Sequence, residues 1–220
     1  MRRHVINTNL HLYHDRTFEG LPVMDKKGPF IEQYLSRCKY TIERALEHYS
    51  RVFAFRVDLR LPLTRELPEH AYTNVVIREF LESFKAKIEH DRQRARARNR
   101  YAHDSKVRYI WVREVGRGDR PHYHLLFLLN ADAYFKVGKK TSREQNIFHR
   151  LQEAWAQALW LSEEDVSGLV GIPPAAEYRL SRRAADERSL ERLFYRTSYL
   201  CKAATKTYGD GQHCFGSSRH

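Results

Sequence analysis

The sequence has no run of eighteen apolar residues, and this absence excludes a membrane-spanning helix. It is also poor in cysteine: Cys38, Cys201 and Cys214 form no CxxC pair, which excludes a zinc ribbon and favours a reducing cytoplasm. The basic segment 1–15 lacks the apolar region of a secretory signal. A GxxxxGK[ST] segment is missing too, so we expect no helicase motor.

Positive charge, by contrast, is abundant. The 220 residues include 39 Lys and Arg against 27 Asp and Glu, a formal net charge of +12. Such an excess favours a polyanionic partner, most often nucleic acid, although a generally basic protein is the alternative. Cations suit the end of a helix, but the cluster near residue 100 exceeds what a helix end needs. We therefore predict phosphate contacts from Arg92, Arg94, Arg96, Arg98 and Arg100.

The periodicity of apolar residues predicts an α+β fold. Helical periods cover 30–50, 71–100, 143–160 and 186–206, and alternating or apolar segments predict strands at 51–62, 107–115 and 122–130. The third strand is apolar on both faces, so we place it in the middle of a sheet, in an antiparallel hairpin with the second. The prediction is a central antiparallel sheet with flanking helices.

Less regular segments complete this expected organisation. Residues 1–29 read as an irregular lead-in, and 161–185 as a loop with a short strand. Ser142 and Gln145 have the spacing of a capping box for the third helix. We divide the chain into an N-terminal extension with one helix (1–50), a main domain (51–210) and an irregular tail (211–220).

Two histidines stand one residue apart at the head of the third strand. Because side chains at i and i+2 of a strand share a face, His122 and His124 project together while Tyr123 points away. Two buried neutral imidazoles each need hydrogen-bond partners, and a shared divalent cation would satisfy both. We predict a metal site; the alternative is a hydrogen-bonded polar cluster.

Glu114 is the candidate third ligand. It shares a strand face with Ile110 and Val112, and the hairpin places it beside the histidines. A carboxylate among apolar residues is costly unless it is paired. Three protein ligands with open positions are typical of a catalytic site, and the oxygens of a phosphate would suit Mg²⁺ or Mn²⁺.

The last predicted helix carries polar residues opposite an apolar stripe. On a helical wheel these are Tyr195, Tyr199, Lys202 and Lys206. A tyrosine with a pKa of about 10 is a weak nucleophile at neutral pH. A lysine one turn away can stabilise the phenolate, and a divalent metal can polarise a phosphate under attack. The alternative is a plain surface of tyrosine and lysine.

Taken together, these segments resemble the motifs of the HUH endonucleases. "PHYHLLFLL" resembles the His–hydrophobic–His motif, "YRTSYLCK" is similar to the two-tyrosine form of the tyrosine motif, and "FAFRVDLRLP" occupies the place of the first motif. They follow in the family's order over about residues 51–206. The two-tyrosine form resembles rolling-circle replication initiators of phages and plasmids, and the closing "CFGSSR" adds a likeness to the gene II-like initiators of filamentous phages and prophages.

The resemblance implies a Rep-type, ferredoxin-like sheet in a metal-dependent single-strand DNA endonuclease and ligase that initiates rolling-circle replication. A tyrosine attacks the scissile phosphate, leaving a 5′-phosphotyrosine and a free 3′-hydroxyl. The implied site comprises the Mg²⁺ or Mn²⁺ ligands His122, His124 and Glu114, the primary nucleophile Tyr199, its partner Tyr195, and Lys202 beside the phosphate. Lys206 joins the arginines as a DNA-binding residue. A single-stranded or supercoiled origin, a host helicase and a polymerase are the implied partners.

Two other functions stay open: a non-catalytic DNA-binding regulator on the same scaffold, and a transposase or relaxase relative. Relaxases usually carry a third histidine, and transposases of this chemistry often carry one tyrosine. The predicted helix also raises a geometric conflict. If its apolar stripe packs on the sheet, the wheel turns Tyr195 and Tyr199 away from the histidines.

Overall fold

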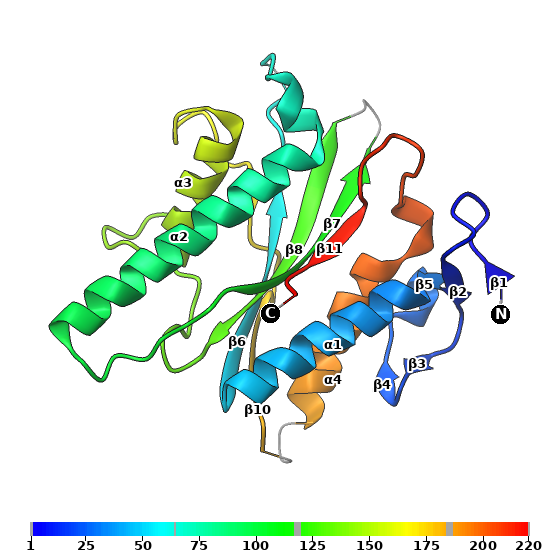
Figure 1. Ribbon diagram of the computed structural model, residues 1–220, viewed down its shortest axis with the longest axis horizontal. Helices are drawn as coiled ribbons and strands as arrows, with labels where there is room; N and C mark the ends of the chain where they lie inside the picture. Colours follow the sequence, from blue (N-terminus) through cyan, green and yellow to red (C-terminus); the bar gives the residue numbers. More distant parts are fainter. Residues whose placement is uncertain (1, 64, 117–119, 184–186, 220) are drawn as a thin grey trace.

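The computed structural model describes residues 2–63, 65–116, 120–183 and 187–219. Its centre is an antiparallel sheet in the order β10-β6-β8-β7-β11, with β9 also paired to β6 (Figure 1). The strands are β6 (Arg51–Leu59), β7 (Arg108–Val115), β8 (Pro121–Asn130), β9 (Val170–Gly171), β10 (Glu177–Ser181) and β11 (Phe215–Ser217). Helices cover both faces, so the predicted α+β architecture with a central antiparallel sheet is confirmed.

Strand β8 lies in the middle of the sheet, as its apolar character on both faces predicts. It pairs with β6 and with β7, and the register sets His122 opposite Glu114 and His124 opposite Asp58. The predicted hairpin of β7 and β8 is therefore confirmed. Four polar side chains from three strands therefore meet at the end of the sheet where β8 begins.

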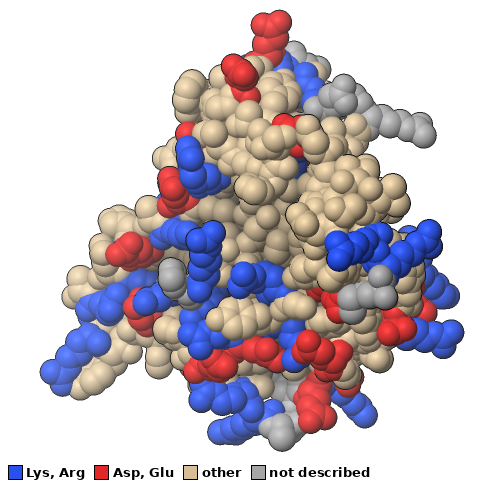
Figure 2. Space-filling view, turned by 45° about the vertical axis from the view of Figure 1, so that its right-hand side comes forward, with Lys and Arg blue, Asp and Glu red and all other residues tan. Residues whose placement is uncertain are grey.

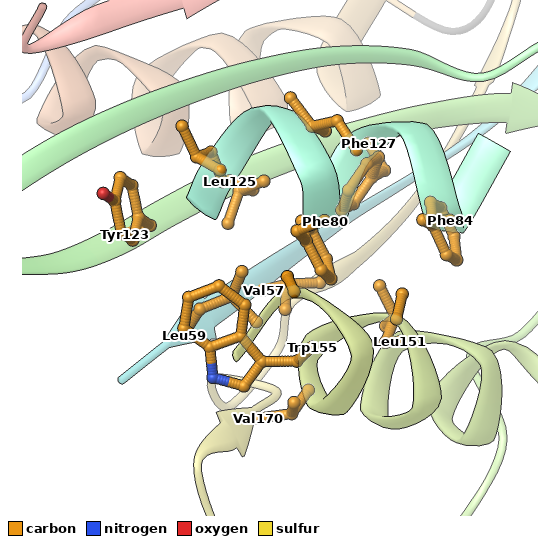
Figure 3. Packing of buried hydrophobic residues seen from close by; sticks show 14 of the residues in the cluster. Val57, Leu59, Phe80, Phe84, Tyr123, Leu125, Phe127, Leu151, Trp155 and Val170 are labelled. Carbon is orange, nitrogen blue, oxygen red and sulfur yellow. The ribbon is translucent and has the colours of Figure 1, made fainter. Parts of the chain in front are cut away.

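One face of the sheet is covered by α2 (Asn74–Arg98) and α3 (Ile147–Leu159). Aromatic side chains dominate this core (Figure 3): the rings of Phe84 and Phe127 lie 4.8 Å apart, and Phe80 meets Trp155 edge-on at 5.7 Å. Burying each of these side chains contributes roughly 1.5–3 kcal/mol. The short η2 (Glu69–Tyr72) leads into α2, whose cap Thr73 accepts a hydrogen bond from the Val75 backbone.

The opposite face, which carries the histidines, is covered by α1 (Glu32–His48) and α4 (Glu187–Ser198). Leu35 and Ile42 of α1 and Phe194 of α4 pack in one core with Ile110 and Leu126 of the sheet. Positions 122, 124 and 126 share a strand face, so these two helices lie on the same side as the histidine pair. Among the described residues, no helix combines the length and apolar character needed to cross a membrane.

Several boundary predictions are wrong. Helix α3 begins at Ile147 with Asn146 as its cap, because the Asn146 side chain accepts from the His149 backbone at 3.1 Å; the expected capping box at Ser142 and Gln145 is not used. The region 161–185 holds two strands, β9 and β10. The tail also forms a strand, β11, which pairs with β7 while Phe215 stacks on Tyr34 at 4.2 Å.

The N-terminal segment is not irregular either. It forms β1 (Arg2–Arg3), β2 (His11–Tyr13), β3 (Thr17–Phe18), β4 (Leu21–Pro22), η1 (Asp25–Lys27) and β5 (Phe30–Ile31). Strands this short carry little periodic signal, because two or three residues cannot show an alternation. Their pairing is set by tertiary contacts, such as that of β2 with β5.

The predicted helix over 186–206 ends early. Its expected start at 186 lies outside the described residues, and α4 stops at Ser198, followed by η4 (Tyr199–Cys201) and η5 (Ala203–Thr205). The Ser198 hydroxyl donates to the Tyr195 carbonyl at 2.7 Å and accepts from the Met24 backbone at 2.9 Å. Lys202 leaves the helical conformation (ψ 135) and forms an isolated antiparallel bridge with Phe30. The helical wheel therefore does not apply beyond Ser198.

Candidate metal centre and adjoining tyrosine

Glu114, His122 and His124 lie together as predicted, with one ligand atom from each within 4.8 Å of the others. The Oε2 atom of Glu114 is 3.7 Å from Nε2 of His122 and 3.7 Å from Nε2 of His124. Bonds of about 2.1 Å to one ion would set ligand atoms about 3.0–3.4 Å apart. The two distances from Glu114 would therefore have to shorten by a few tenths of an ångström, and the two imidazoles would have to turn towards each other, for all three to bind one cation.

Asp58 orients one of the histidines, a role that was not predicted from the sequence. Nδ1 of His124 donates to Oδ1 of Asp58 at 2.6 Å, which leaves Nε2 free on the side of Glu114. Burial lowers the pKa of His124, but the carboxylates of Asp58 and Glu114 outweigh it and raise that pKa. One feature of the sequence could have identified Asp58: it is a carboxylate in a largely apolar strand, two residues after Arg56.

Glu114 divides its two oxygens between different partners. While Oε2 faces the histidines, Oε1 accepts from the Thr205 hydroxyl at 2.5 Å and from Lys206 Nζ at 3.2 Å. Burial alone would raise the pKa of Glu114, but the neighbouring imidazoles of His122 and His124 and the Lys206 charge hold it far below its usual range. The carboxylate is therefore ionised and available to a cation.

The prediction that Lys206 contacts DNA is wrong. Its side chain is 0% exposed and pairs with Glu114, so it cannot reach a phosphate on the surface. The ammonium group is drawn inward because Glu114 is a buried anion that needs a counter-charge. Burial lowers the pKa of Lys206, while Glu114 opposes that change.

Lys202 links Tyr199 to this cluster. Nζ of Lys202 is 3.8 Å from the centroid of the Tyr199 ring and 3.8 Å from Oε1 of Glu114, so one ammonium group contacts both. The conflict raised by the helical wheel disappears. The apolar stripe of α4 does pack towards the sheet, yet Tyr199 belongs to the following 3-10 turn, where the chain changes direction.

Tyr195 lies elsewhere. It is 38% exposed on α4 and lines a pocket with Tyr178 and Arg196. Of the two tyrosines, therefore, Tyr199 is the one that Lys202 links to the cluster.

A second buried cation, Arg56, adjoins the cluster and was not assigned a role from the sequence. It is 6% exposed and projects from the same face of β6 as Asp58, whose Oδ1 lies 3.9 Å from its Nη2. Its Nε atom has no hydrogen-bond partner among the residues that the structure describes. Burial lowers the pKa of this guanidinium, and the Tyr199 phenol is among the groups that influence it.

The predicted arginine cluster lies away from the metal centre. Asn130 of β8 contacts Asp104 in the loop after α2, so this helix end adjoins the far end of β8, about 25 Å from His122 at the usual rise per residue. Arg92 is engaged internally: it binds Asp91 at 2.5 Å and lies 4.4 Å from the Tyr134 ring. The other four arginines are exposed: Arg94, Arg96, Arg98 and Arg100.

The surface is nevertheless strongly basic near a hollow. In the face shown in Figure 2, Lys and Arg side chains flank the hollow at the middle of the molecule, with Asp and Glu gathered below it. This distribution of charge can attract a polyanion.

Comparison with known proteins matches residues 13–218 to a family described as the YagK/YfjJ C-terminal domain. "Uncharacterized protein YfjJ" of Escherichia coli K12 is 30% identical over 200 residues, covering 87% of this chain and 96% of its own. "Uncharacterized protein YagK" of the same organism is 30% identical over 210 residues, covering 93% and 98%. No solved structure matches the chain.

Proposed function

The chain belongs to the YagK/YfjJ C-terminal domain family, and we propose that it is a metal-dependent, tyrosine-type single-strand DNA endonuclease and ligase of the HUH type. In this proposal it nicks a replication origin of a phage, prophage or plasmid and initiates rolling-circle replication. The observation that carries the proposal is one chain of contacts. Lys202 contacts the Tyr199 ring and Glu114, and Glu114 faces His122 and His124.

The donor set fits Mg²⁺ or Mn²⁺. One carboxylate oxygen and two imidazole nitrogens converge, and Asp58 orients His124, so phosphate oxygens and water can complete the coordination. Such an ion, when bound, would polarise the scissile phosphate and neutralise charge that develops on it. The antiparallel sheet with the histidines on its central strand also agrees with a Rep-type, ferredoxin-like arrangement.

The roles of the side chains follow from their positions. The Tyr199 oxygen attacks the phosphorus, forming a phosphotyrosine bond on the 5′ side of the downstream fragment as the 3′-oxygen of the upstream fragment leaves. Lys202 stabilises the phenolate and the phosphate by its charge. Tyr195 serves the later strand transfer, after a movement of α4 or of the DNA. Arg94, Arg96, Arg98 and Arg100 bind the DNA backbone at a distance from the reaction.

A covalent-adduct assay tests the proposal. Single-stranded oligonucleotides that tile the protein's own replicon are labelled at the 3′ end and incubated with the protein and Mn²⁺. Cleavage leaves the labelled fragment on the protein, where a denaturing gel detects it. We expect the adduct with the wild type and with Tyr40→Phe, a matched change at an exposed tyrosine of α1, and none with Tyr199→Phe or without metal.

Other outcomes would change the assignment. An adduct that persists in Tyr199→Phe and disappears in Tyr195→Phe would exchange the roles of the two tyrosines. Tight, salt-dependent DNA binding with no adduct on any tiled oligonucleotide would overturn the nuclease and support the regulator.

A further inference from the structure

A pocket of about 540 Å³ opens between α4, β10 and β4. Its apolar walls come from four side chains with flat or rigid rings: Pro22, Pro174, Tyr178 and Tyr195. A volume of this size accommodates a small organic ligand. Aromatic rings are the surfaces on which single-stranded nucleic acids stack their bases.

The pocket is also lined by cations. Arg192 and Arg196 project from α4, with Glu191 as the one carboxylate among the described lining residues. Arg56, buried beneath, lies close enough to Arg196 that the two charges repel, and this adds to the effect of burial in lowering the pKa of Arg56. The Nε atom of Arg56 also lacks a hydrogen-bond acceptor among the described residues, so this guanidinium is only partly compensated. An anion bound at the mouth of the pocket would reduce the repulsion between Arg56 and Arg196.

Position ties the pocket to the reacting tyrosine. Tyr178 of the pocket is the pairing partner of Ala54 in β6, and Arg56 and Asp58 follow at two-residue steps on the same face of that strand. Arg56 therefore lies between the pocket and the residues around His124. A strand whose phosphate rests at Tyr199 would have its neighbouring nucleotide within reach of α4.

We infer that this pocket binds one nucleotide of the single-stranded DNA substrate, adjacent to the scissile phosphate. The base lies among the rings of Tyr178, Tyr195 and the two prolines, and the phosphate is held by Arg192 and Arg196. The inference rests on the proposed function, because it takes DNA as the substrate. It adds a built-in preference for the base beside the nick, which the metal centre and the tyrosine cannot supply.

Mononucleotide binding tests the inference without cleavage. The four deoxynucleoside 5′-monophosphates and deoxyribose 5-phosphate are titrated separately in EDTA and followed by NMR chemical shifts. We expect Arg192→Glu to weaken nucleotide binding about tenfold and Glu191→Gln to tighten it about threefold, since each exposed charge has a modest effect. Arg188→Glu is the matched control on α4, outside the pocket lining, and should leave affinity within about twofold. Deoxyribose 5-phosphate should bind at least tenfold more weakly than the preferred nucleotide.

Several outcomes of this titration would overturn the inference. Equal binding of nucleotide and sugar phosphate, or equal effects of Arg192→Glu and Arg188→Glu, would overturn the pocket as a base-binding site. The absence of nucleotide binding would do the same. The proposed nuclease is judged separately by the covalent adduct: a pocket that binds nucleotides in a protein that forms no adduct refutes the enzyme, and an adduct without pocket binding refutes this inference.

Discussion

Oδ1 of Asp58 accepts a hydrogen bond of 2.6 Å from Nδ1 of His124, and the two residues are direct partners in the pairing of β6 with β8. This contact fixes the tautomer and the direction of the imidazole, so that Nε2 points to Glu114. A carboxylate in this position behind a ligating histidine raises the basicity of the ring. The candidate metal centre thus draws its residues from three strands: β6, β7 and β8.

The first prediction concerns this contact. Asp58→Asn should weaken Mn²⁺ binding about 10- to 100-fold, because the amide holds the ring less firmly and removes a negative charge. Isothermal titration calorimetry would measure it. Asp132→Asn, at the other end of the sheet beside Arg51, is the matched control and should leave the affinity unchanged. Equal affinity in wild type and Asp58→Asn would show that Asp58 plays no part in metal binding.

A second prediction separates the structural role of Glu114 from its role as a ligand. Glu114→Gln leaves the ammonium group of Lys206 buried without its counter-charge, so we expect a loss of about 3–5 kcal/mol in the free energy of unfolding. His122→Ala, which removes only the ligand, should cost far less. Urea unfolding measures both.

The double variant Glu114→Gln with Lys206→Met provides the control. It should recover most of the lost stability, because neither buried charge remains, while metal binding stays lost. If the double variant is no more stable than Glu114→Gln, the pair of Glu114 and Lys206 is not the source of the effect.

The strand core and the histidine cluster were predictable from the sequence, because both depend on the alternation of side chains along a strand. The two-residue period puts His122 and His124 on one face, and the short hairpin then brings Glu114 opposite His122. These relationships are local, or span a single loop. The apolar run from Leu125 to Leu129 likewise predicted the central position of β8.

The surroundings of Tyr199 were not predictable in the same way. A helical wheel assumes that the helix continues, whereas the bridge of Lys202 to Phe30 and the hydrogen bond of Ser198 to Met24 end it. Both partners lie more than 170 positions away in the chain, where no local pattern reveals them. Lys206 was misplaced for the same reason, since its partner Glu114 lies on a distant strand.

The third prediction tests Lys202 as a stabiliser of the phenolate. Lys202→Met keeps much of the side-chain volume but removes the charge, so we expect adduct formation at neutral pH to slow about 100-fold. The deficit should shrink as the pH rises towards the pKa of tyrosine, because the phenolate then forms without help. Adduct rates from pH 6 to pH 9.5 would measure it. A deficit that is constant across this range would indicate that Lys202 only positions the phosphate.

The exposed arginines of α2 give a fourth prediction. If Arg94 and Arg98 contact phosphates, changing both to Gln should weaken binding to all DNA sequences alike. The slope of log affinity against log salt should fall by about 1.4, because each contact with a single strand contributes about 0.7. Fluorescence anisotropy at several salt concentrations would measure the slope. Arg78→Gln with Arg37→Gln, two changes of the same charge at exposed positions outside the cluster, is the control. An unchanged slope would remove the cluster from the DNA interface.

The fifth prediction is a dependence of stability on pH that arises from Asp91. Its carboxylate accepts from Tyr134 at 2.5 Å, from Arg92 at 2.5 Å and from Arg150 at 2.5 Å. Burial alone would raise the pKa of Asp91, but the hydrogen bonds of Tyr134 and Arg92 and the charge of Arg150 lower it below its ordinary value. A lowered pKa means that the stabilisation is complete above the unfolded-state value of about 3.9 and is lost as the pH falls through the folded-state value.

Asp91→Asn should therefore lower the free energy of unfolding by about 2 kcal/mol at pH 6, where wild-type Asp91 is ionised. Below about pH 3.9 the difference should shrink, because wild-type Asp91 becomes protonated on unfolding and then also in the folded state. Urea unfolding at pH 3, 4 and 6 would follow this change. Asp25→Asn, whose partner Arg16 is exposed, should show little effect at any of these values. The difference in the free energy of unfolding between wild type and Asp91→Asn could instead stay constant from pH 6 to pH 3. In that case the ionisation of Asp91 would not supply the stability, and its shape and hydrogen bonding alone would hold α2 to α3.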